Sequence, residues 1–271
     1  MLSTTEEDSL YPNLSELSVA EILEAINRED QKVALAVKDQ LKAISALVEA
    51  VAEAMEKGGR LFYIGAGTSG RLGILDASEC PPTYGVPYDL VTGIIAGGDG
   101  AIRKAVEFAE DNTELAYEDL KASGLSDKDF VIGISASGRT PYVLGGIKAC
   151  NENGILTGSI CCNMNSEISK HSRYPVEVVV GPEIITGSTR MKAGTAQKLV
   201  LNMITSTVMV RLGKVEGSKM VNMQLSNHKL IDRGTRMVME KTGLVYEQAN
   251  ELLLKYGSVK KALEYYGNKK S

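Results

Sequence analysis

LFYIGAGTSG, residues Leu61–Gly70, joins a short apolar run to a turn rich in glycine and hydroxyl groups. The run has the length and the composition of a buried β-strand, and a helical pattern follows the turn. A second segment of the same design is Phe130–Pro141, with the sequence FVIGISASGRTP. Each turn therefore lies where a strand is expected to pass into a helix, at the carboxyl end of that strand.

Short apolar runs alternate with helical segments through the middle of the chain. Runs of this kind, with almost no polar interruption, are typical of parallel strands that helices cover on both faces. The predicted fold class is therefore α/β, a three-layer α/β/α sandwich with a five-stranded parallel sheet. The expected strands are Leu61–Gly65, Leu90–Ala96, Phe130–Ser135, Leu156–Cys161 and Val176–Val180.

Helical periodicity dominates both ends of the chain. Apolar residues recur at three- and four-residue steps from Leu17 to Lys57, and a further long helix is expected from about Thr189 to Arg211. Within the C-terminal part, Thr242–Leu263 looks like a compact helical hairpin of the ubiquitin-associated kind, with Gly243 and Gly257 at the expected ends of helices. The predicted parts are N-terminal helices over residues 1–58, a sheet domain over residues 59–220 and a helical subdomain over residues 221–271.

The composition limits which partners and compartments are expected. A formal net charge of -4, with acidic and basic residues interspersed, gives no basic stripe of the kind that binds nucleic acid. Polar residues interrupt the apolar stretch Leu199–Leu212, and the acidic N-terminus does not resemble a secretory signal. The four cysteines lack zinc-ligand spacing. We therefore expect a cytoplasmic protein with no nucleic-acid or membrane partner and no bound metal.

The first turn contains the spacing of a dinucleotide-binding fingerprint at Gly65, Gly67 and Gly70. The acidic residue that such a site needs at the end of the next strand is missing, because Asp89 precedes that strand. A glycine-rich turn before a helix suits any anion that needs backbone N–H groups and a positive helix end. The sequence thus favours an anion site over a nicotinamide site.

The second turn carries three hydroxyl groups, on Ser135, Ser137 and Thr140. Hydroxyl donors near a helix N-terminus suit a phosphate monoester, although serine and threonine also favour such positions as simple helix caps. Capping would be the better explanation for either turn alone. Two such turns at the carboxyl ends of parallel strands favour a shared ligand site, because ligands of open α/β sheets bind at that edge.

This pair of turns resembles the sugar isomerase (SIS) fold, in which the two turns hold a phosphosugar. The resemblance implies a set of phosphate-binding residues, Gly67, Thr68, Ser69, Ser135, Ser137 and Thr140. SIS domains serve isomerases, synthases, lyases and non-catalytic regulators, so the fold alone does not define a reaction.

Longer strings resemble one SIS family, the N-acetylmuramic acid 6-phosphate etherases, from about Leu17 to about Leu230. They are Gly58–Gly85, ending in LGILDASECPPTYG, IAGG at Ile95–Gly98, AEDN at Ala109–Asn112 and GSTRMKAGTAQK at Gly187–Lys198. The resemblance implies a lyase that eliminates D-lactate from the phosphorylated amino sugar and then adds water, with no metal or redox cofactor. It also implies a homodimer with the site at the interface, in the recycling of cell-wall amino sugar.

The family's two catalytic carboxylates map to Glu79 and Glu110, and both surrounding motifs are unchanged. Cleavage of this ether needs one group to remove the C2 proton and one to protonate the departing oxygen. The resemblance suggests Glu79 as the acid, and Glu110 as the base that takes the C2 proton and later activates water. Read from the residues alone, Glu79 lies between a helix and a rigid Pro81–Pro82 turn, whereas Glu110 fits a solvated helix end equally well.

Three further residues are assigned to the ligand site. Ser188 and Arg190 follow the fifth expected strand, although Arg190 and Lys192 also fit plain surface charges at the start of a helix. Lys229, beside a lone histidine, is included because a helix from a neighbouring subunit often closes SIS sites. There it would stabilise the enolate or attract the lactyl carboxylate.

Two rival functions remain open. A non-catalytic SIS regulator would keep the serine turns and have no use for both glutamates. A phosphosugar isomerase would need a glutamate base but no acid directed at lactate. Both rivals share the phosphosugar ligand, so only the reaction separates them.

Overall fold

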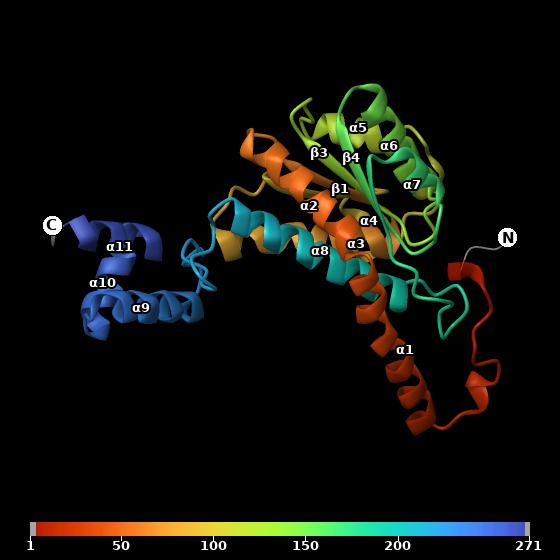
Figure 1. Cartoon of the computed structure of the whole chain (residues 1–271), viewed down its shortest axis with the longest axis horizontal. Helices are drawn as coiled ribbons and strands as arrows, with labels where there is room; N and C mark the ends of the chain where they lie inside the picture. The colour runs from red at the N-terminus through yellow and green to blue at the C-terminus, as the bar shows by residue number, and fades with distance from the viewer. Residues whose placement is uncertain (1–3, 269–271) are drawn as a thin grey trace. The chain divides into compact units, whose positions relative to one another are not determined.

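The computed structural model describes residues 4–268, which form two compact units (Figure 1). The first unit comprises the chain up to Ala77 together with Val91–Ser206, and the second comprises Ser78–Leu90 together with the chain from Thr207. None of the helices in the described part of the chain has the length and the hydropathy that a membrane crossing requires. The strands are β1 (Leu61–Gly65), β2 (Val91–Ile95), β3 (Phe130–Ile134), β4 (Leu156–Cys161) and β5 (Tyr174–Glu177). The helices are α1 (Val19–Asp39), α2 (Leu41–Glu56), α3 (Gly67–Tyr84), α4 (Gly100–Arg103), α5 (Leu115–Ala122), α6 (Pro141–Glu152), α7 (Glu167–His171), α8 (Lys192–Arg211), α9 (His228–Thr242), α10 (Tyr246–Tyr256) and α11 (Val259–Asn268), with 3-10 turns η1 (Thr4–Glu6), η2 (Leu14–Glu16) and η3 (Ala109–Asp111).

The strands form one parallel sheet in the order β2-β1-β3-β4-β5. β1 to β4 lie where the sequence predicts them, to within one residue at either end, and the predicted α/β fold class is confirmed. The range predicted for the last strand is wrong, because β5 ends at Glu177 and does not extend to Val180. Val178 still donates its backbone N–H to the carbonyl oxygen of Cys161 on β4 over 2.8 Å, whereas Val180 is buried beyond the paired residues of this edge strand.

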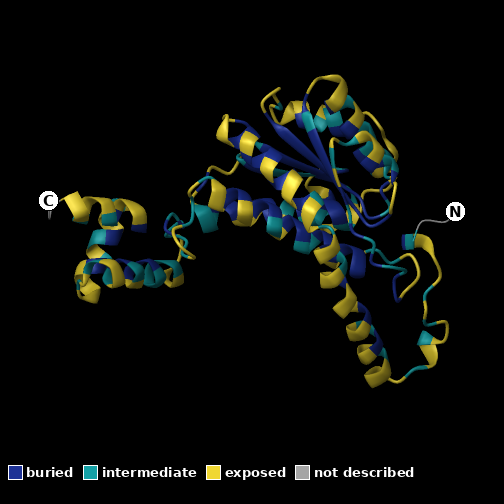
Figure 2. Cartoon of the chain, viewed as in Figure 1, coloured by how far each residue is buried: buried dark blue, intermediate teal, exposed yellow. Residues whose placement is uncertain are grey.

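Helices cover both faces of the sheet, which makes the three layers (Figure 1). On one face, Val143 and Ile147 of α6 join a core cluster with Phe62 of β1, and α5 packs against α6. On the other face lie α2, α3 and α8, with Gly73 of α3 so close to β1 that an added Cβ would come within 2.9 Å of Tyr63 Cβ. β1 and β3 are buried along their whole length (Figure 2). Burial on both faces is what their almost continuous apolar sequences indicate.

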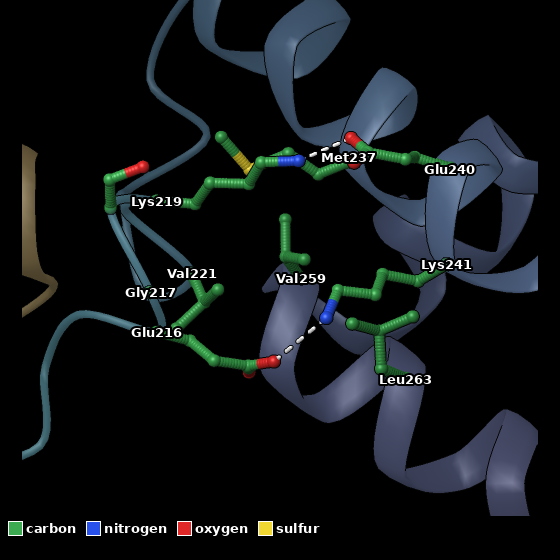
Figure 3. A pocket seen from close by; sticks show the side chains of 10 residues that line it. Glu216, Gly217, Lys219, Val221, Met237, Glu240, Lys241, Val259 and Leu263 are labelled. Atoms are coloured by element: carbon green, nitrogen blue, oxygen red, sulfur yellow. Dashed lines mark hydrogen bonds and ion pairs between the residues drawn. The ribbon is translucent and has the colours of Figure 1, made fainter.

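The second unit has a small core of its own. Its buried members are Val221, Met223, Val238, Ala249, Leu253, Val259 and Ala262. Gly243 and Gly257 follow α9 and α10 in the left-handed conformation, with φ of 75° and 73°, a backbone geometry that ends helices at low cost for glycine. Two ion pairs, Lys219–Glu240 and Lys241–Glu216, line a cavity of about 300 Å³ beside these helices (Figure 3).

A buried carboxylate links α3 to β1 and to α8. Asp76 is 5% exposed and accepts hydrogen bonds from Tyr63 Oη and Thr205 Oγ1, each over 3.1 Å. Burial, the largest effect, raises the pKa of Asp76 from 3.8 to about 6, although the two hydroxyl donors lower it. The ionised form of Asp76 is therefore the costly one at neutral pH.

Asp76→Asn is expected to stabilise the protein at neutral pH and to remove part of its pH dependence. Because the pKa is raised in the folded state, the contribution of Asp76 is fully present below pH 3.8 and is lost as the pH rises through about 6. The free energy of unfolding of the variant should therefore gain up to roughly 3 kcal/mol over the wild type between about pH 4 and about pH 7. Urea unfolding across this range measures the gain.

Asp129→Asn is the control for this prediction. Burial raises the pKa of Asp129, but Arg60 and Ser126 more than offset it and hold the pKa below its ordinary value. The change in the free energy of unfolding therefore has the opposite sign. Relative to the wild type, Asp129→Asn should lose most stability at neutral pH and less as the pH falls through the ordinary pKa of an aspartate. A difference between Asp76→Asn and wild type that does not vary with pH would contradict the prediction.

Candidate active site

The two serine-bearing turns lie at the same edge of the sheet. β1 and β3 are neighbours, with Gly65 paired to Ile134, so the residues that follow them leave the sheet side by side. The chain passes from β1 to β2 on one side and then to β3 on the other, so the strand order reverses between β1 and β3. Ligands of open α/β sheets bind outside the carboxyl ends of the strands at such a point.

The first turn is tight because two glycines let the strand and the helix approach each other. A Cβ on Gly65 would lie 2.7 Å from the backbone N of Gly70, and one on Gly70 would lie 2.6 Å from Ile95 Cγ1. Gly67 is exposed, has a φ of 51° and is the first residue of α3. The first N–H groups of a helix lack intrahelical acceptors, so this turn presents donors to an anion.

Two side chains of the first turn lie against α8. Ser69 is buried, and its Oγ donates a hydrogen bond of 3.0 Å to Oε1 of Gln197. Thr68 lies beside Gly194, where an added Cβ would come within 3.4 Å of Thr68 Cγ2. Nothing in the local sequence singles out Gln197, a polar residue within a long helix whose partner is 128 positions away.

The second turn gathers its hydroxyl groups into one cluster. Ser135 Oγ lies 2.8 Å from Thr140 Oγ1 and 3.4 Å from Ser137 Oγ, and it accepts from the backbone N of Gly138 over 3.0 Å. Gly138 has a φ of 68°, and an added Cβ would overlap Ser166. α6 begins directly after Thr140, so a second helix N-terminus lies at this cluster. The structure thus brings the three predicted hydroxyl groups together.

Asn163, which the sequence-based prediction missed, supports this second turn. Its Nδ2 donates to the carbonyl oxygens of Ala136 (3.1 Å) and Ser137 (3.3 Å), and its Oδ1 accepts from the backbone N of Thr5 over 3.2 Å. The side chain is buried. Asn163 comes just after β4, at the edge of the sheet where the two turns lie, and a polar residue at that position is the signal that points to it.

The loop before α8 carries Ser188 and Arg190. Ser188 is half-buried and Arg190 is exposed. The N-terminal segment holds the start of this loop, because Ser9 Oγ donates to the carbonyl oxygen of Ile184 over 2.7 Å. The reading of Lys192 as a surface charge is wrong, because Lys192 is 2% exposed and its Nζ lies 2.7 Å from Glu29 Oε2. Of the charges in this segment, Arg190 alone stays a candidate ligand.

Glu110 lines a cavity of about 180 Å³ together with Gly67 and Arg71. Arg71 donates to the carbonyl oxygens of Ala101 and Ile102, each over 2.7 Å, and so ties the segment after β2 to α3. The turn η3 carries Glu110 and follows Phe108, an exposed non-glycine residue with a φ of 60°. The exposed carboxylate of Glu110 is therefore brought to the same cavity as the first turn.

Glu79 is exposed on α3, in the part of that helix that belongs to the second unit. The expected turn at Pro81–Pro82 is wrong, because α3 continues through both prolines and ends at Tyr84. A proline has no backbone N–H, so at these two positions α3 lacks the helical hydrogen bonds that other residues would donate to the carbonyl oxygens of Ala77 and Ser78. The chain leaves α3 at Gly85, which has a left-handed backbone conformation with a φ of 64°.

Lys229 is exposed in the first turn of α9 and also belongs to the second unit. Asn227 caps this helix, because its side chain accepts from the backbone N of Leu230 over 2.9 Å. The positions of Glu79 and Lys229 in a ligand site stay predictions. Within the first unit, the residues brought to the carboxyl edge of the sheet are Gly67, Thr68, Ser69, Glu110, Ser135, Ser137 and Thr140.

Solved structures of two phosphoheptose isomerases share this fold. The one from Francisella tularensis has a TM-score of 0.55 at 14% identity and covers 72% of this chain and 100% of its own. The one from Neisseria gonorrhoeae has a TM-score of 0.54 at 17% identity and covers 70% and 98%. Residues 43–151 match the family model of the glucokinase regulatory protein N-terminal SIS domain, and residues 101–207 match the SIS domain model. These likenesses confirm the SIS fold.

Similarity to curated proteins is much higher and extends over almost the whole chain. An N-acetylmuramic acid 6-phosphate etherase from Bacteroides fragilis is 57% identical over 265 residues, which are 98% of this chain and 94% of that protein. One from Porphyromonas gingivalis is 59% identical over 96% of this chain and 95% of its own length. One from Bacillus cereus is 56% identical over 92% and 85%. The family resemblance seen in the sequence is thereby confirmed, and this chain belongs to the N-acetylmuramic acid 6-phosphate etherase family.

Proposed function

We propose that this chain cleaves the D-lactyl ether of N-acetylmuramic acid 6-phosphate and releases N-acetylglucosamine 6-phosphate and D-lactate. The observation that carries the proposal is the 57% identity to an etherase over 98% of this chain. The two hydroxyl-bearing turns, one after β1 and one after β3, support the proposal, because a phosphorylated sugar needs such an anion site. The isomerase alternative has less support, since the likeness to phosphoheptose isomerases, at 14% and 17% identity, is one of fold alone.

In this proposal the phosphate binds between the two turns. A phosphate dianion accepts hydrogen bonds, and hydroxyl and backbone N–H groups next to positive helix ends donate them. α3 and α6 both begin at these turns. The proposed donors are Gly67, Thr68, Ser69, Ser135, Ser137 and Thr140.

The chemistry begins from the open-chain sugar, whose C1 aldehyde acidifies the C2 proton. Glu110 removes this proton, the electron pair left at C2 forms the C2=C3 double bond, and the C3–O bond breaks. Glu79 gives its proton to the departing lactate oxygen. Water then adds at C3 and C2 recovers a proton.

The family resemblance gives the activation of water to Glu110, whereas the protonation states that the elimination leaves favour Glu79 for this step. After the elimination Glu79 is a carboxylate and Glu110 is protonated. Glu79 is therefore the group that accepts the proton of the attacking water, and Glu110 returns its proton to C2. Both glutamates then regain their starting states, and no metal or redox cofactor enters the balance.

The remaining assignments complete the proposed site. Ser188, Arg190 and Lys229 are proposed to bind the rest of the substrate, with Lys229 supplied by the partner in a homodimer. Exposed apolar residues of α1, among them Val19 and Leu23, suit such an interface. We place the reaction in the cytoplasm, where it would recycle the amino sugar of the cell wall.

Incubation of the purified protein with N-acetylmuramic acid 6-phosphate tests the proposal. D-lactate and N-acetylglucosamine 6-phosphate should appear in equal amounts. An isomerase would convert phosphosugars without releasing lactate, and a non-catalytic regulator would bind the compound and leave it intact. Either of those results would contradict the etherase function.

A further inference from the structure

Gln197 is a buried polar side chain that the proposed reaction does not use. It is 1% exposed in the second turn of α8, and its Nε2 has no hydrogen-bond partner within residues 4–268. A buried N–H group without an acceptor costs free energy, and the few that native proteins keep call for an explanation. At the other end of the same amide, Oε1 accepts from Ser69 Oγ over 3.0 Å. The unpaired Nε2 thus belongs to the same amide group that contacts Ser69, a residue proposed to bind the phosphate.

This hydrogen bond has the wrong direction for phosphate binding. Ser69 has a single hydroxyl hydrogen, and that hydrogen is directed at Gln197, so only lone pairs remain for another group. A phosphate dianion also offers only lone pairs. A half-turn of the amide about its Cγ–Cδ bond would place Nε2 against Ser69 Oγ. The Ser69 hydrogen would then be free for the phosphate, Nε2 would have its acceptor, and Oε1 would take the position that Nε2 leaves.

The packing of α3 against α8 holds the two residues together. Thr68 of α3 lies beside Gly194 of α8, one turn before Gln197. This contact fixes the spacing of the two helices and with it the distance between Ser69 and the Gln197 amide. A chain from Nε2–H to Ser69 Oγ–H to a phosphate oxygen also polarises each hydrogen bond, which makes the hydroxyl a stronger donor.

We propose that Gln197 is a positioning residue for the phosphate. Gln197 acts through Ser69 and does not touch the substrate. In the structure its amide accepts the Ser69 hydrogen. When a phosphate monoester binds, the amide turns, donates to Ser69 Oγ and releases that hydrogen to a phosphate oxygen. This inference rests on the proposed phosphate site, and it extends that site to a residue on α8.

One experiment follows the amide itself. Protein labelled with ¹⁵N in the glutamine side chains is titrated with inorganic phosphate, and the Gln197 signal is identified by its loss in Gln197→Met. The Gln197 Nε2 hydrogen signal is expected to move downfield in the wild type and to stay in place in Ser69→Ala. A wild-type signal that is unchanged at saturating phosphate would overturn the proposal.

A double-mutant cycle tests the same coupling through dissociation constants for N-acetylglucosamine 6-phosphate. Gln197→Met should weaken binding about tenfold, and Gln197→Glu about a hundredfold, because glutamate can only accept from Ser69 and adds a negative charge. The double variant Ser69→Ala/Gln197→Met should bind within about twofold of Ser69→Ala, since Gln197 acts only through Ser69. In turnover, KM should rise by these factors while kcat changes less.

Thr205→Val is the matched control, a buried polar group removed from the same helix. It should lower stability and leave the dissociation constant unchanged. Additive losses in the double variant would overturn this proposal and leave the etherase function standing. If the wild type bound neither inorganic phosphate nor the phosphosugar, the phosphate site and this inference would both fall. Should Gln197→Met not fold, Gln197→Glu, which also lacks the Nε2 hydrogens, identifies the signal, and the wild-type titration and the dissociation constant of Gln197→Glu still decide.

Discussion

Glu110→Gln is expected to slow D-lactate release by about 10²–10⁴-fold, with little change in KM. Glutamine keeps the size and polarity of the side chain but cannot take a proton from C2. The position of Glu110 supports this large effect, because its side chain lines a cavity of about 180 Å³ with Gly67 at the start of α3. The measurement is kcat for lactate release. Asp111→Asn, the neighbouring exposed carboxylate in η3, is the control and should retain kcat within about twofold.

Hydrogen exchange at C2 separates the base from the acid. In heavy water, N-acetylglucosamine 6-phosphate should exchange its C2 proton with the wild-type enzyme and with Glu79→Gln. It should not exchange with Glu110→Gln, because the proton then has no acceptor. Glu79→Gln should nevertheless lose lactate release, since the departing oxygen lacks its proton donor. The assignment of Glu110 as base fails if Glu110→Gln keeps the exchange at the wild-type rate.

The sheet could be predicted because its signals are local. β1 is apolar over every residue before a glycine turn, and its burial on both faces is what that pattern indicates. β5 marks the limit of this reasoning. Val180 is buried beyond the ladder, and an apolar pattern does not distinguish a residue buried in a loop from one buried in a strand.

The two turns could be predicted for the same reason, and the residues that join them to the rest of the site could not. Local patterns of glycine and hydroxyl residues predict that Ser69 and Ser135 belong to a ligand site. The pairing of β1 with β3, which brings the two serine-bearing turns together, depends on the strand order. Glu110 lies in a short 3-10 turn with no periodic pattern, and only the family resemblance selected it. Gln197 meets Ser69 from 128 positions away, a distance over which single-sequence patterns carry no information.

The same limit explains why the sequence does not reveal that Lys192 is buried. Its partner Glu29 is 163 positions away on α1, and the two side chains meet in the interior, at 2% and 4% exposure. Glu29 also accepts from Lys32 Nζ over 2.6 Å and from Tyr11 Oη over 3.2 Å. Although burial acts to raise it, Lys192 and Lys32 lower the pKa of Glu29 to about 2. The interaction therefore ties α1 to α8 through a charge that stays ionised.

Lys192→Met is expected to lower the free energy of unfolding of the first unit by about 3–5 kcal/mol at neutral pH, because it leaves a buried carboxylate without its buried partner. Glu29→Gln should cost a similar amount for the opposite reason, an uncompensated ammonium group. Urea unfolding measures the loss, and hydrogen exchange of the α1 and α8 amides should locate it. Lys57→Met is the control, since Lys57 pairs with Glu53 at 70% and 67% exposure and its loss should leave stability unchanged within error.

The pH dependence and a double variant separate the lost charge pair from lost packing. A lowered pKa means that Glu29 contributes stability above pH 4.5 that is lost as the pH falls toward about 2. The loss in Lys192→Met should therefore be largest at neutral pH and shrink in acid, where the stranded carboxyl group takes up a proton. Glu29→Leu/Lys192→Met removes both charges and should regain most of the stability, because two apolar side chains leave no charge to desolvate. If the double variant is instead as unstable as the sum of the single ones, the loss is one of packing, and the ion pair does not hold α1 to α8.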